Sequence, residues 1–225
     1  MRDINKNNCS KIVISDEDDK LKMTAEKLGV DEHELMNIIS VMSDTGLLST
    51  CHSFTVDALM SELYTDTLTG LPNKKYAIKS IQDMLQAGNH DFSVLYIDVD
   101  GFKEVNDVFG HSVGDDVIKI MSMRFNGILR SGDECIRLHG DEFLVIAKNI
   151  KTNSDLEMIA SKIISSIQYI EYKNNVFNMS CSVGICDLGT TYDSYTPEEI
   201  INKSDDAMYR AKNSGKNKFM YYSGR

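Results

Sequence analysis

Two neighbouring carboxylates, Asp141 and Glu142, lie at a predicted tight turn. Gly140 precedes them, and the turn is flanked by a first strand-like run at 135–138 and by a continuous apolar run at 143–147. A short Gly-containing turn between two such segments indicates a β-hairpin. Adjacent carboxylates repel each other, and a bound divalent cation would relieve that repulsion. The alternative interpretation is an ordinary solvated hairpin tip.

A second acidic segment favours the cation over the solvated tip. Residues 92–97 are mostly apolar, with β-branched and aromatic side chains, and predict a buried strand that runs into Asp98-Val99-Asp100. A neighbouring strand would bring Asp98 close to the acidic turn. A few oxygen ligands, with room for water and phosphate oxygens, suit Mg²⁺, which would polarise a polyphosphate. The alternative for Asp98 is a strand-end acid that caps the following helix.

Five ordered groups of residues carry a resemblance that extends from Asp66 to Asn217. They are Asp66-x-Leu68-Thr69-Gly70-Leu71-Pro72-Asn73-Lys74; Asp98-x-Asp100-x-Phe102-Lys103-x-x-Asn106-Asp107-x-x-Gly110-His111-x-x-Gly114-Asp115; Arg130-x-x-Asp133; Arg137-x-His139-Gly140-Asp141-Glu142-Phe143; and Asp206 and Met208 followed by Tyr209-x-Ala211-Lys212-x-x-Gly215-Lys216-Asn217. In order and spacing they resemble the GGDEF family of diguanylate cyclases, and five motifs together are far more specific than one short pattern.

The resemblance implies an enzyme that condenses two molecules of GTP into cyclic di-GMP and releases two pyrophosphates. Each 3′-hydroxyl would attack the α-phosphate of the other nucleotide, with Mg²⁺ or Mn²⁺ as cofactor. Each chain would offer half of a site, so the implied partners are GTP, cyclic di-GMP and a second copy of this chain.

The resemblance also assigns expected roles to individual residues. The cation would be held by Asp98, the backbone carbonyl of Val99, and Asp141. Glu142 would bind a second cation or help to deprotonate the 3′-hydroxyl. Residues expected to contact GTP are the phosphate-binding Gly101, Phe102 and Lys103, the guanine-binding Asn106 and Asp115, and Gly140, Lys212 and Lys216.

Two further pairs of residues are expected to have roles other than catalysis or substrate binding. Arg130 and Asp133 match the product-inhibition site of the family. There the forked guanidinium of Arg would bind phosphate or the Hoogsteen edge of guanine, and Asp would accept from guanine N–H groups. Asp66 and Arg137 are expected to form a structural salt bridge between the start of the domain and the hairpin. The alternative for Arg130 and Asp133 is that they form an ordinary polar turn. The alternative for Asp115 is that its charge only stabilises the start of a helix. Lys212 and Lys216 could likewise be ordinary solvated side chains.

His139 departs from the family, which usually has Gly at this position. The imidazole would obstruct the nucleotide, twist the turn, point to solvent or stack on a base. Because the matched carboxylates are all present, we favour an active cyclase. The alternative is a catalytically degenerate module that binds GTP or cyclic di-GMP as a sensor.

Composition excludes other classes of function. The chain has 225 residues and a net charge of −10, and residues 1–65 carry 6 basic and 12 acidic side chains, so nucleic-acid binding is not expected. The five cysteines are scattered without a metal-ligand spacing, which fits a reducing cytoplasm. The sequence contains neither a signal-peptide pattern nor an apolar run long enough to span a membrane.

The pattern predicts three parts. Residues 1–19 form a polar, mobile arm, residues 20–64 a small all-helical regulatory or dimerisation segment, and residues 65–225 the GGDEF domain. The expected fold of the last part is α+β, a ferredoxin-like or palm-type, antiparallel-rich sheet with helices on one face. Helices are predicted at 74–87, 102–109, 114–129, 154–167 and 197–213, and strands at 92–98, 134–148 (a hairpin), 177–185 and 219–222.

Overall fold

The computed structural model describes Asp31, Leu35 and residues 63–150, 152–188 and 195–223. The chain divides into two compact units, Met1–Leu63 and Tyr64–Arg225. In the first unit Leu35 is buried and its amide donates to the carbonyl of Asp31. The predicted arm and nearly all of the predicted N-terminal helices lie outside the described residues.

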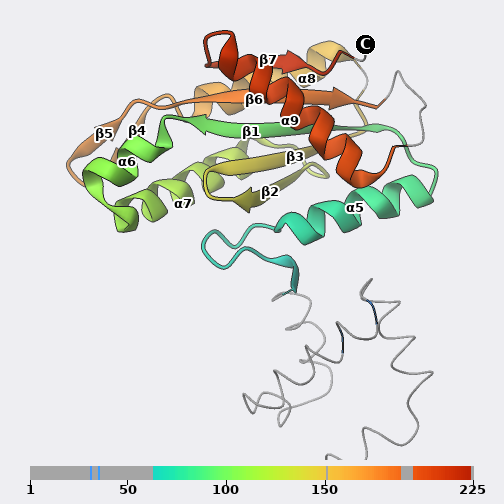
Figure 1. The fold of residues 1–225 in the computed structure, drawn as a ribbon, viewed down its shortest axis with the longest axis horizontal. Helices are drawn as coiled ribbons and strands as arrows, with labels where there is room; N and C mark the ends of the chain where they lie inside the picture. Colours follow the sequence, from blue (N-terminus) through green and yellow to red (C-terminus); the bar gives the residue numbers. More distant parts are fainter. Residues whose placement is uncertain (1–30, 32–34, 36–62, 151, 189–194, 224–225) are drawn as a thin grey trace, which may run out of the picture. The chain divides into compact units, whose positions relative to one another are not determined.

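A five-stranded sheet organises the second unit, in the order β2-β3-β1-β6-β7 (Figure 1). Neighbouring strands are antiparallel except β6 and β7, which are parallel. The first four strands have the order expected of a β-α-β-β-α-β chain, and β7 extends it at one edge. The strands are β1 (Phe92–Asp100), β2 (Glu134–His139), β3 (Glu142–Lys148), β6 (Ser180–Asp187) and β7 (Lys218–Tyr221).

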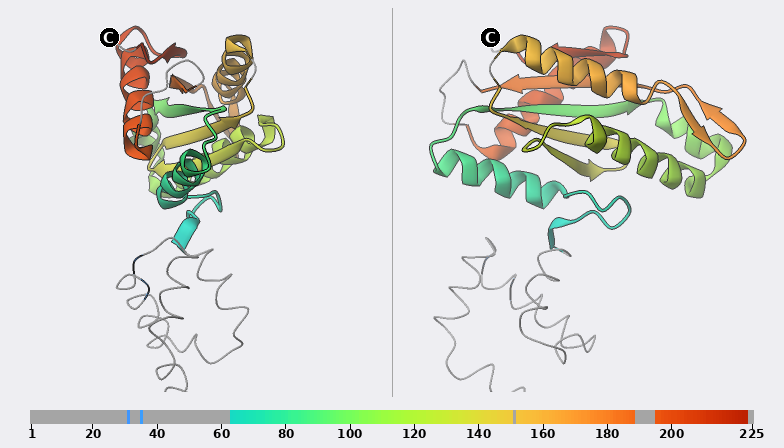
Figure 2. Two further views of the ribbon diagram at one scale, coloured as in Figure 1. Left: turned by 90° about the vertical axis from the view of Figure 1, so that its right-hand side faces the viewer. Right: turned by 180° about the vertical axis from the view of Figure 1, so that it is seen from behind.

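Helices cover both faces of this sheet, which corrects the expectation of helices on one face only (Figure 2). The crossover helices α7 (His111–Ile128) and α8 (Asn153–Ser166) pack on one face, together with α6 (Phe102–Phe109). On the other face lie α5 (Lys74–Gln86) and α9 (Pro197–Asn213). The central strands are therefore buried on both sides, which explains why β1 is a nearly continuous apolar run.

Local capping signals set the helix starts. Thr196 caps α9 and forms a reciprocal capping box with Glu199, and Pro197 occupies the first turn, where its missing N–H costs nothing. Asn73 caps α5 by accepting from the amide of Tyr76. The bounds of α6 and α9 agree with those predicted, whereas α7 begins three residues earlier than predicted, directly after Gly110.

The segment 170–187 differs from the single predicted strand at 177–185. Phe177 belongs to a separate two-stranded hairpin, made of β4 (Ile170–Tyr172) and β5 (Asn175–Phe177), and the sheet strand β6 begins only at Ser180. Strands of three residues are too short to show a period in the sequence. Within the described ranges, no helix has the length and apolarity that crossing a membrane would require.

Candidate active site

The register of the sheet brings the predicted acidic residues together. β1 lies between β3 and β6, so Asp98 stands directly opposite Glu142 on one side and Ser182 on the other. The amide of Val99 donates to the carbonyl of Asp141 at 3.4 Å, which ties the acidic turn to the end of β1. Two carboxylates directly opposite each other on paired strands destabilise a sheet, so this pairing calls for a compensating positive charge.

Asp98 is the most constrained of these carboxylates, with 7% of its surface exposed. Its Oδ2 lies 2.6 Å from Nζ of Lys212 on α9. Its Oδ1 is buried and has no hydrogen-bond partner within the described part of the chain. Burial raises the pKa of this carboxyl to about 6; Lys212 opposes that rise, and the charges of Asp141 and Glu142 add to it.

The arrangement suits a divalent cation. Asp98 offers a buried carboxylate oxygen that no described residue bonds, and burial also raises the pKa of Asp141. Among the described residues, no three acidic, histidine or cysteine side chains by themselves form a complete cation site. Mg²⁺ is commonly bound by one or two carboxylates, with water and substrate phosphates as its other ligands, and this donor set fits that pattern.

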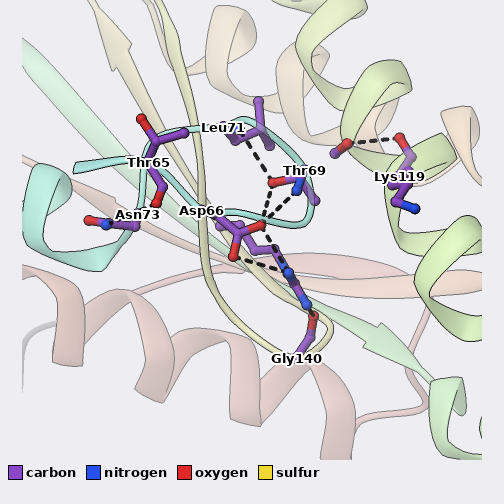
Figure 3. A network of polar contacts seen from close by, with 9 residues as sticks. Thr65, Asp66, Thr69, Leu71, Asn73, Lys119 and Gly140 are labelled. Carbon is purple, nitrogen blue, oxygen red and sulfur yellow. Dashed lines mark hydrogen bonds and ion pairs between the residues drawn. The ribbon is translucent and has the colours of Figure 1, made fainter. Parts of the chain in front are cut away.

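Arg137 connects the acidic turn to the first residues of the domain (Figure 3). Its Nη1 donates to both carboxylate oxygens of Asp66, at 2.9 and 3.1 Å, so the predicted ion pair forms. Its Nε and Nη2 donate to the carbonyl of Gly140 at 3.0 and 2.8 Å. Burial would raise the pKa of Asp66, but hydrogen bonds from Thr69 and Arg137 outweigh burial and lower it. The turn is therefore tied, through Arg137 of β2, to Asp66 outside the hairpin.

Glu142 has two neighbours on its Oε2 atom. The buried Tyr96 hydroxyl donates a hydrogen bond to this oxygen, and Nε2 of His139 lies 3.2 Å from it. The His139 side chain is 64% exposed. Of the arrangements considered for His139, the structure therefore has the ring largely in solvent with one nitrogen facing Glu142.

The segment expected to receive phosphates begins α6. Gly101 precedes the helix with φ of +75°, a left-handed conformation that a residue without Cβ adopts at little cost. No side chain caps this helix start in the described structure, so the amides of Phe102 and Lys103 lack a side-chain acceptor. A helix start without a cap has the polarity that attracts an anion.

The residues expected to read guanine meet where α6 and α7 join. Asn106 lies on α6, and its Oδ1 would stand only 2.0 Å from a Cβ placed on Gly114 of α7. Asp115 follows Gly114 and is exposed. The side chain of Asn106 therefore occupies the space that the missing side chain of Gly114 leaves free, next to Asp115.

The two lysines expected to bind phosphate lie near the end of α9. Lys212 contacts Asp98, whereas Lys216 is exposed in the turn before β7. Lys216 and Asn217 both have positive φ, of 57° and 49°, which is unusual for residues with a side chain. The Asp100 carboxylate accepts from the amide of Asn217 at 3.2 Å and so ties this turn to the end of β1.

The pair Arg130 and Asp133 is already engaged within the chain. Asp133 accepts from Nε of Arg130 at 3.2 Å and from the amide of Lys148 at 3.1 Å, and 2% of its side chain is exposed. Nη2 of Arg130 donates to the carbonyl of Lys148 at 3.0 Å. A ligand here would meet the half-exposed guanidinium of Arg130 before it met Asp133.

Sequence reasoning assigned no role to three residues that contact or surround this site. Asp100 belongs to a sequence motif, but its hydrogen bonds to Ser180 and Ser182 depend on the register between β1 and β6. Its bond to the amide of Asn217 joins residues 117 positions apart in the sequence. The sequence pattern places Tyr96 only within an apolar strand. The pKa of Asp205 is raised by burial and by the nearby charge of Glu142. Asp205 lies seven residues before Lys212, two helical turns away on the same face of α9. This spacing could have indicated from the sequence that Asp205 faces the site.

Comparison with known proteins agrees with this arrangement. The family described as "Diguanylate cyclase, GGDEF domain" matches residues 63–218. Over 166 residues the chain is 36% identical to cyclic di-GMP phosphodiesterase PdeR of Escherichia coli, and over 158 residues it is 35% identical to diguanylate cyclase TpbB of Pseudomonas aeruginosa. These alignments cover 71% and 69% of this chain, but only 24% and 36% of the two relatives.

Solved structures show the same fold. A GGDEF-only fragment of TpbB from Pseudomonas aeruginosa has a TM-score of 0.63 at 33% identity, over 71% of this chain and 94% of the fragment. The coiled coil and GGDEF domain of DgcB from Caulobacter crescentus, in complex with c-di-GMP, has a TM-score of 0.66 at 18% identity, over 83% of this chain and 97% of that one. With the family match, the shared fold and the acidic strand ends taken together, this chain belongs to the GGDEF family of diguanylate cyclase domains.

Proposed function

We propose that this protein is an active, cation-dependent diguanylate cyclase that converts two molecules of GTP into cyclic di-GMP and two pyrophosphates. In each half of the reaction a 3′-oxygen bonds to the α-phosphorus of the other nucleotide, pyrophosphate leaves, and the hydroxyl proton passes to a base. The observation that carries the proposal is the buried Oδ1 of Asp98, which has no hydrogen-bond partner among the described residues and lies opposite Glu142 and beside Lys212.

The acidic residues have the cation-binding roles. Asp98, Asp141 and the carbonyl of Val99 would hold Mg²⁺ or Mn²⁺, which would neutralise the phosphates and polarise the α-phosphate for attack. Glu142 would hold a second cation or accept the proton of the 3′-hydroxyl. Lys212, which neutralises Asp98 in the cation-free protein, would be released to the terminal phosphates when the cation takes its place.

The remaining residues orient GTP. The uncapped start of α6, with the amides of Phe102 and Lys103 after Gly101, would receive the terminal phosphates together with Lys216 and the backbone of Gly140. Asn106 and Asp115 would bind the guanine edge, because a carboxylate accepts from both N1–H and N2–H. A site with these acceptors rejects adenine, which lacks that pair of donors.

Condensation of two nucleotides requires two copies of the site, so the active species would be a homodimer. We propose that residues 20–64 promote the meeting of the two chains, and that residues 65–225 form the catalytic domain. Nucleic acid is not among the proposed partners, because residues 1–65 are acidic overall. Light scattering at increasing concentrations of protein, with and without residues 1–62, tests this role.

Nucleotide chromatography tests the activity directly. Purified protein at high concentration, incubated with GTP and Mg²⁺, should yield cyclic di-GMP and pyrophosphate in a ratio of one to two, and EDTA should abolish both. If GTP binds but no product forms, the chain is instead a degenerate binding module. A gain of activity in the His139→Gly variant would then assign the block to that residue.

We predict that Gly114→Ala weakens the recognition of GTP. The new methyl group would lie 2.0 Å from Oδ1 of Asn106 and would move that side chain away from the guanine. Loss of one hydrogen bond to the base corresponds to a rise of about tenfold in KM for GTP. The variant Gly127→Ala in the same helix, where a Cβ meets nothing within 4 Å, is the matched control and should leave KM unchanged. An unchanged KM in Gly114→Ala would remove Asn106 from the recognition of guanine.

We predict that Arg130→Ala relieves inhibition by cyclic di-GMP. Arg130 is half exposed and presents its guanidinium to solvent, whereas the Asp133 carboxylate is buried and engaged. Loss of a charge-assisted contact would raise the inhibition constant about ten- to a hundredfold. Initial rates measured with added cyclic di-GMP test this, with Arg124→Ala, whose guanidinium binds the carbonyls of Ser166 and Tyr169, as a control. Unaltered inhibition in Arg130→Ala would place the inhibitory site elsewhere.

A further inference from the structure

Tyr96 is a buried polar side chain directed at the acidic site. It precedes Asp98 by two residues on β1, so the two side chains lie on the same face of the sheet. Tyr96 is 7% exposed and packs with the apolar residues between the sheet and α5 and α9. Its hydroxyl reaches along this face and donates to Oε2 of Glu142. An apolar side chain would fill the same position without that bond.

The phenol hydroxyl of Tyr96 carries a hydrogen, whereas an ionised carboxylate can only accept one. The direction of the hydrogen bond is thereby fixed: Tyr96 donates and Glu142 accepts. A neutral donor of this kind holds a carboxylate without competing with a cation for its charge.

His139 contacts the same oxygen from the other side of the turn. Its Nε2 lies 3.2 Å from Oε2 of Glu142, so this one oxygen has both neighbours. In the described structure neither of these contacts involves Oε1. Glu142 is thus fixed through one oxygen, by a buried tyrosine and an exposed histidine, while the other oxygen is left for a different partner.

We propose that Tyr96 and His139 are positioning residues, which hold the Glu142 carboxylate by Oε2 and keep its Oε1 available to the divalent cation. This inference rests on the proposed function, in which Glu142 is a cation ligand. Groups that hydrogen-bond to a ligating carboxylate fix its orientation, and their loss commonly weakens metal binding by ten- to a hundredfold. On this view His139 replaces the usual glycine as a support for Glu142 and not as an obstruction.

Mn²⁺ binding tests the proposal without any need for catalysis. Mn²⁺ is titrated into the nucleotide-free protein, and free Mn²⁺ is followed by electron paramagnetic resonance. Tyr96→Phe, which keeps the ring and removes only the hydroxyl, should weaken Mn²⁺ binding about tenfold. The control is Tyr221→Phe on β7, which removes a hydroxyl that donates to the carbonyl of Asn153. This variant should leave Mn²⁺ binding unchanged.

A double-mutant cycle identifies the route of the effect. Glu142→Gln should weaken Mn²⁺ binding at least as much as Tyr96→Phe, and the double variant should bind no more weakly than Glu142→Gln alone, because Tyr96 acts through Glu142. His139→Ala should weaken binding several-fold, less than Tyr96→Phe because the imidazole is exposed, and His139→Gln, which retains a donor, should restore it.

The outcomes separate the two proposals. Equal Mn²⁺ affinity in Tyr96→Phe and the wild-type protein, additive effects in the double variant, or an absence of Mn²⁺ binding in the wild type would each overturn the positioning role. If the wild-type protein binds Mn²⁺ and Tyr96→Phe weakens that binding, but no cyclic di-GMP forms, the positioning role stands and the cyclase activity fails. Melting temperatures of Tyr96→Phe and His139→Ala close to the wild type show that the variants are folded.

Discussion

Replacing Asp98 with asparagine should abolish the proposed cyclase activity and, at the same time, stabilise the cation-free protein above pH 6. The activity falls because the substitution removes the buried carboxylate oxygen that the proposed cation would bind. A metal ion contributes several kcal/mol to the stabilisation of charge in the transition state, so we expect a loss of about a thousandfold in kcat. Chromatography of the nucleotide products measures this loss.

The gain in stability follows from the pKa of Asp98. This carboxyl has an ordinary pKa of 3.8 and a pKa of about 6 in the folded protein, because it is buried. Since the folded state binds the proton more tightly, the cost of ionising Asp98 is absent below pH 3.8, grows between pH 3.8 and 6, and is complete above pH 6. A shift of two pKa units corresponds to about 3 kcal/mol.

Asparagine at this position carries no charge, so the variant avoids that cost. Its advantage over the wild type should be largest near pH 7.5 and about half as large near pH 5, which corresponds to a melting-temperature gain that is larger by a few degrees at the higher pH. Thermal unfolding in EDTA at both pH values measures the difference, with Asp91→Asn, an exposed carboxylate, as the control. A gain of the same size at both pH values would contradict the assigned cause, and activity retained in Asp98→Asn would contradict the cation site.

Gly184→Ala should destabilise the whole domain. A Cβ at Gly184 of β6 would lie 2.0 Å from the carbonyl oxygen of Ser204 and 2.2 Å from the amide nitrogen of Met208, both backbone atoms of α9. Backbone atoms cannot rotate away as a side chain can, so the helix must move off the sheet. We expect a loss of at least about 3 kcal/mol in the free energy of unfolding, the upper end of the usual cost of overpacking.

Urea unfolding of this variant measures that loss, and the activity of the folded fraction is a second readout. α9 carries Lys212, which contacts Asp98, so a displaced helix should also weaken GTP binding. The control Gly127→Ala adds a methyl group to a helical position where a Cβ meets nothing within 4 Å, and should be neutral or stabilise by about 0.5–1 kcal/mol. An unchanged midpoint in Gly184→Ala would mean that β6 and α9 do not approach each other so closely.

The sequence predicted the elements whose signals are local. The bounds of α9 follow from Thr196, Pro197 and Glu199, which mark a helix start on their own, and the acidic turn between β2 and β3 follows from Gly140 between apolar runs. The hairpin of β4 and β5 was missed because its three-residue strands carry no period. The predicted number of sheet faces covered by helices was wrong, because the amphipathic pattern of a helix shows that it packs on the sheet but not on which face.

The candidate site shows the same division between local and non-local information. Asp98 and Glu142 were recognised from strand ends and motifs that a sequence displays directly. The contact of Tyr96 with Glu142 and that of Asp100 with Asn217 join residues 46 and 117 positions apart. Such contacts depend on strand register and on the docking of α9, and both are settled only when the domain folds.

The bonds of Arg137 have a consequence for control of this domain. The Arg137 guanidinium donates to Asp66, at the start of the domain, and to Gly140, beside the acidic residues. The backbone amide of Arg137 donates to the carbonyl of Pro72 at 2.9 Å. Asp66 and the acidic turn are thus joined through a single side chain. On the proposed function, a signal that arrives at that end would move the acidic turn together with Asp66, so regulation of such a protein would consist in steering two intact halves of a site toward or away from each other.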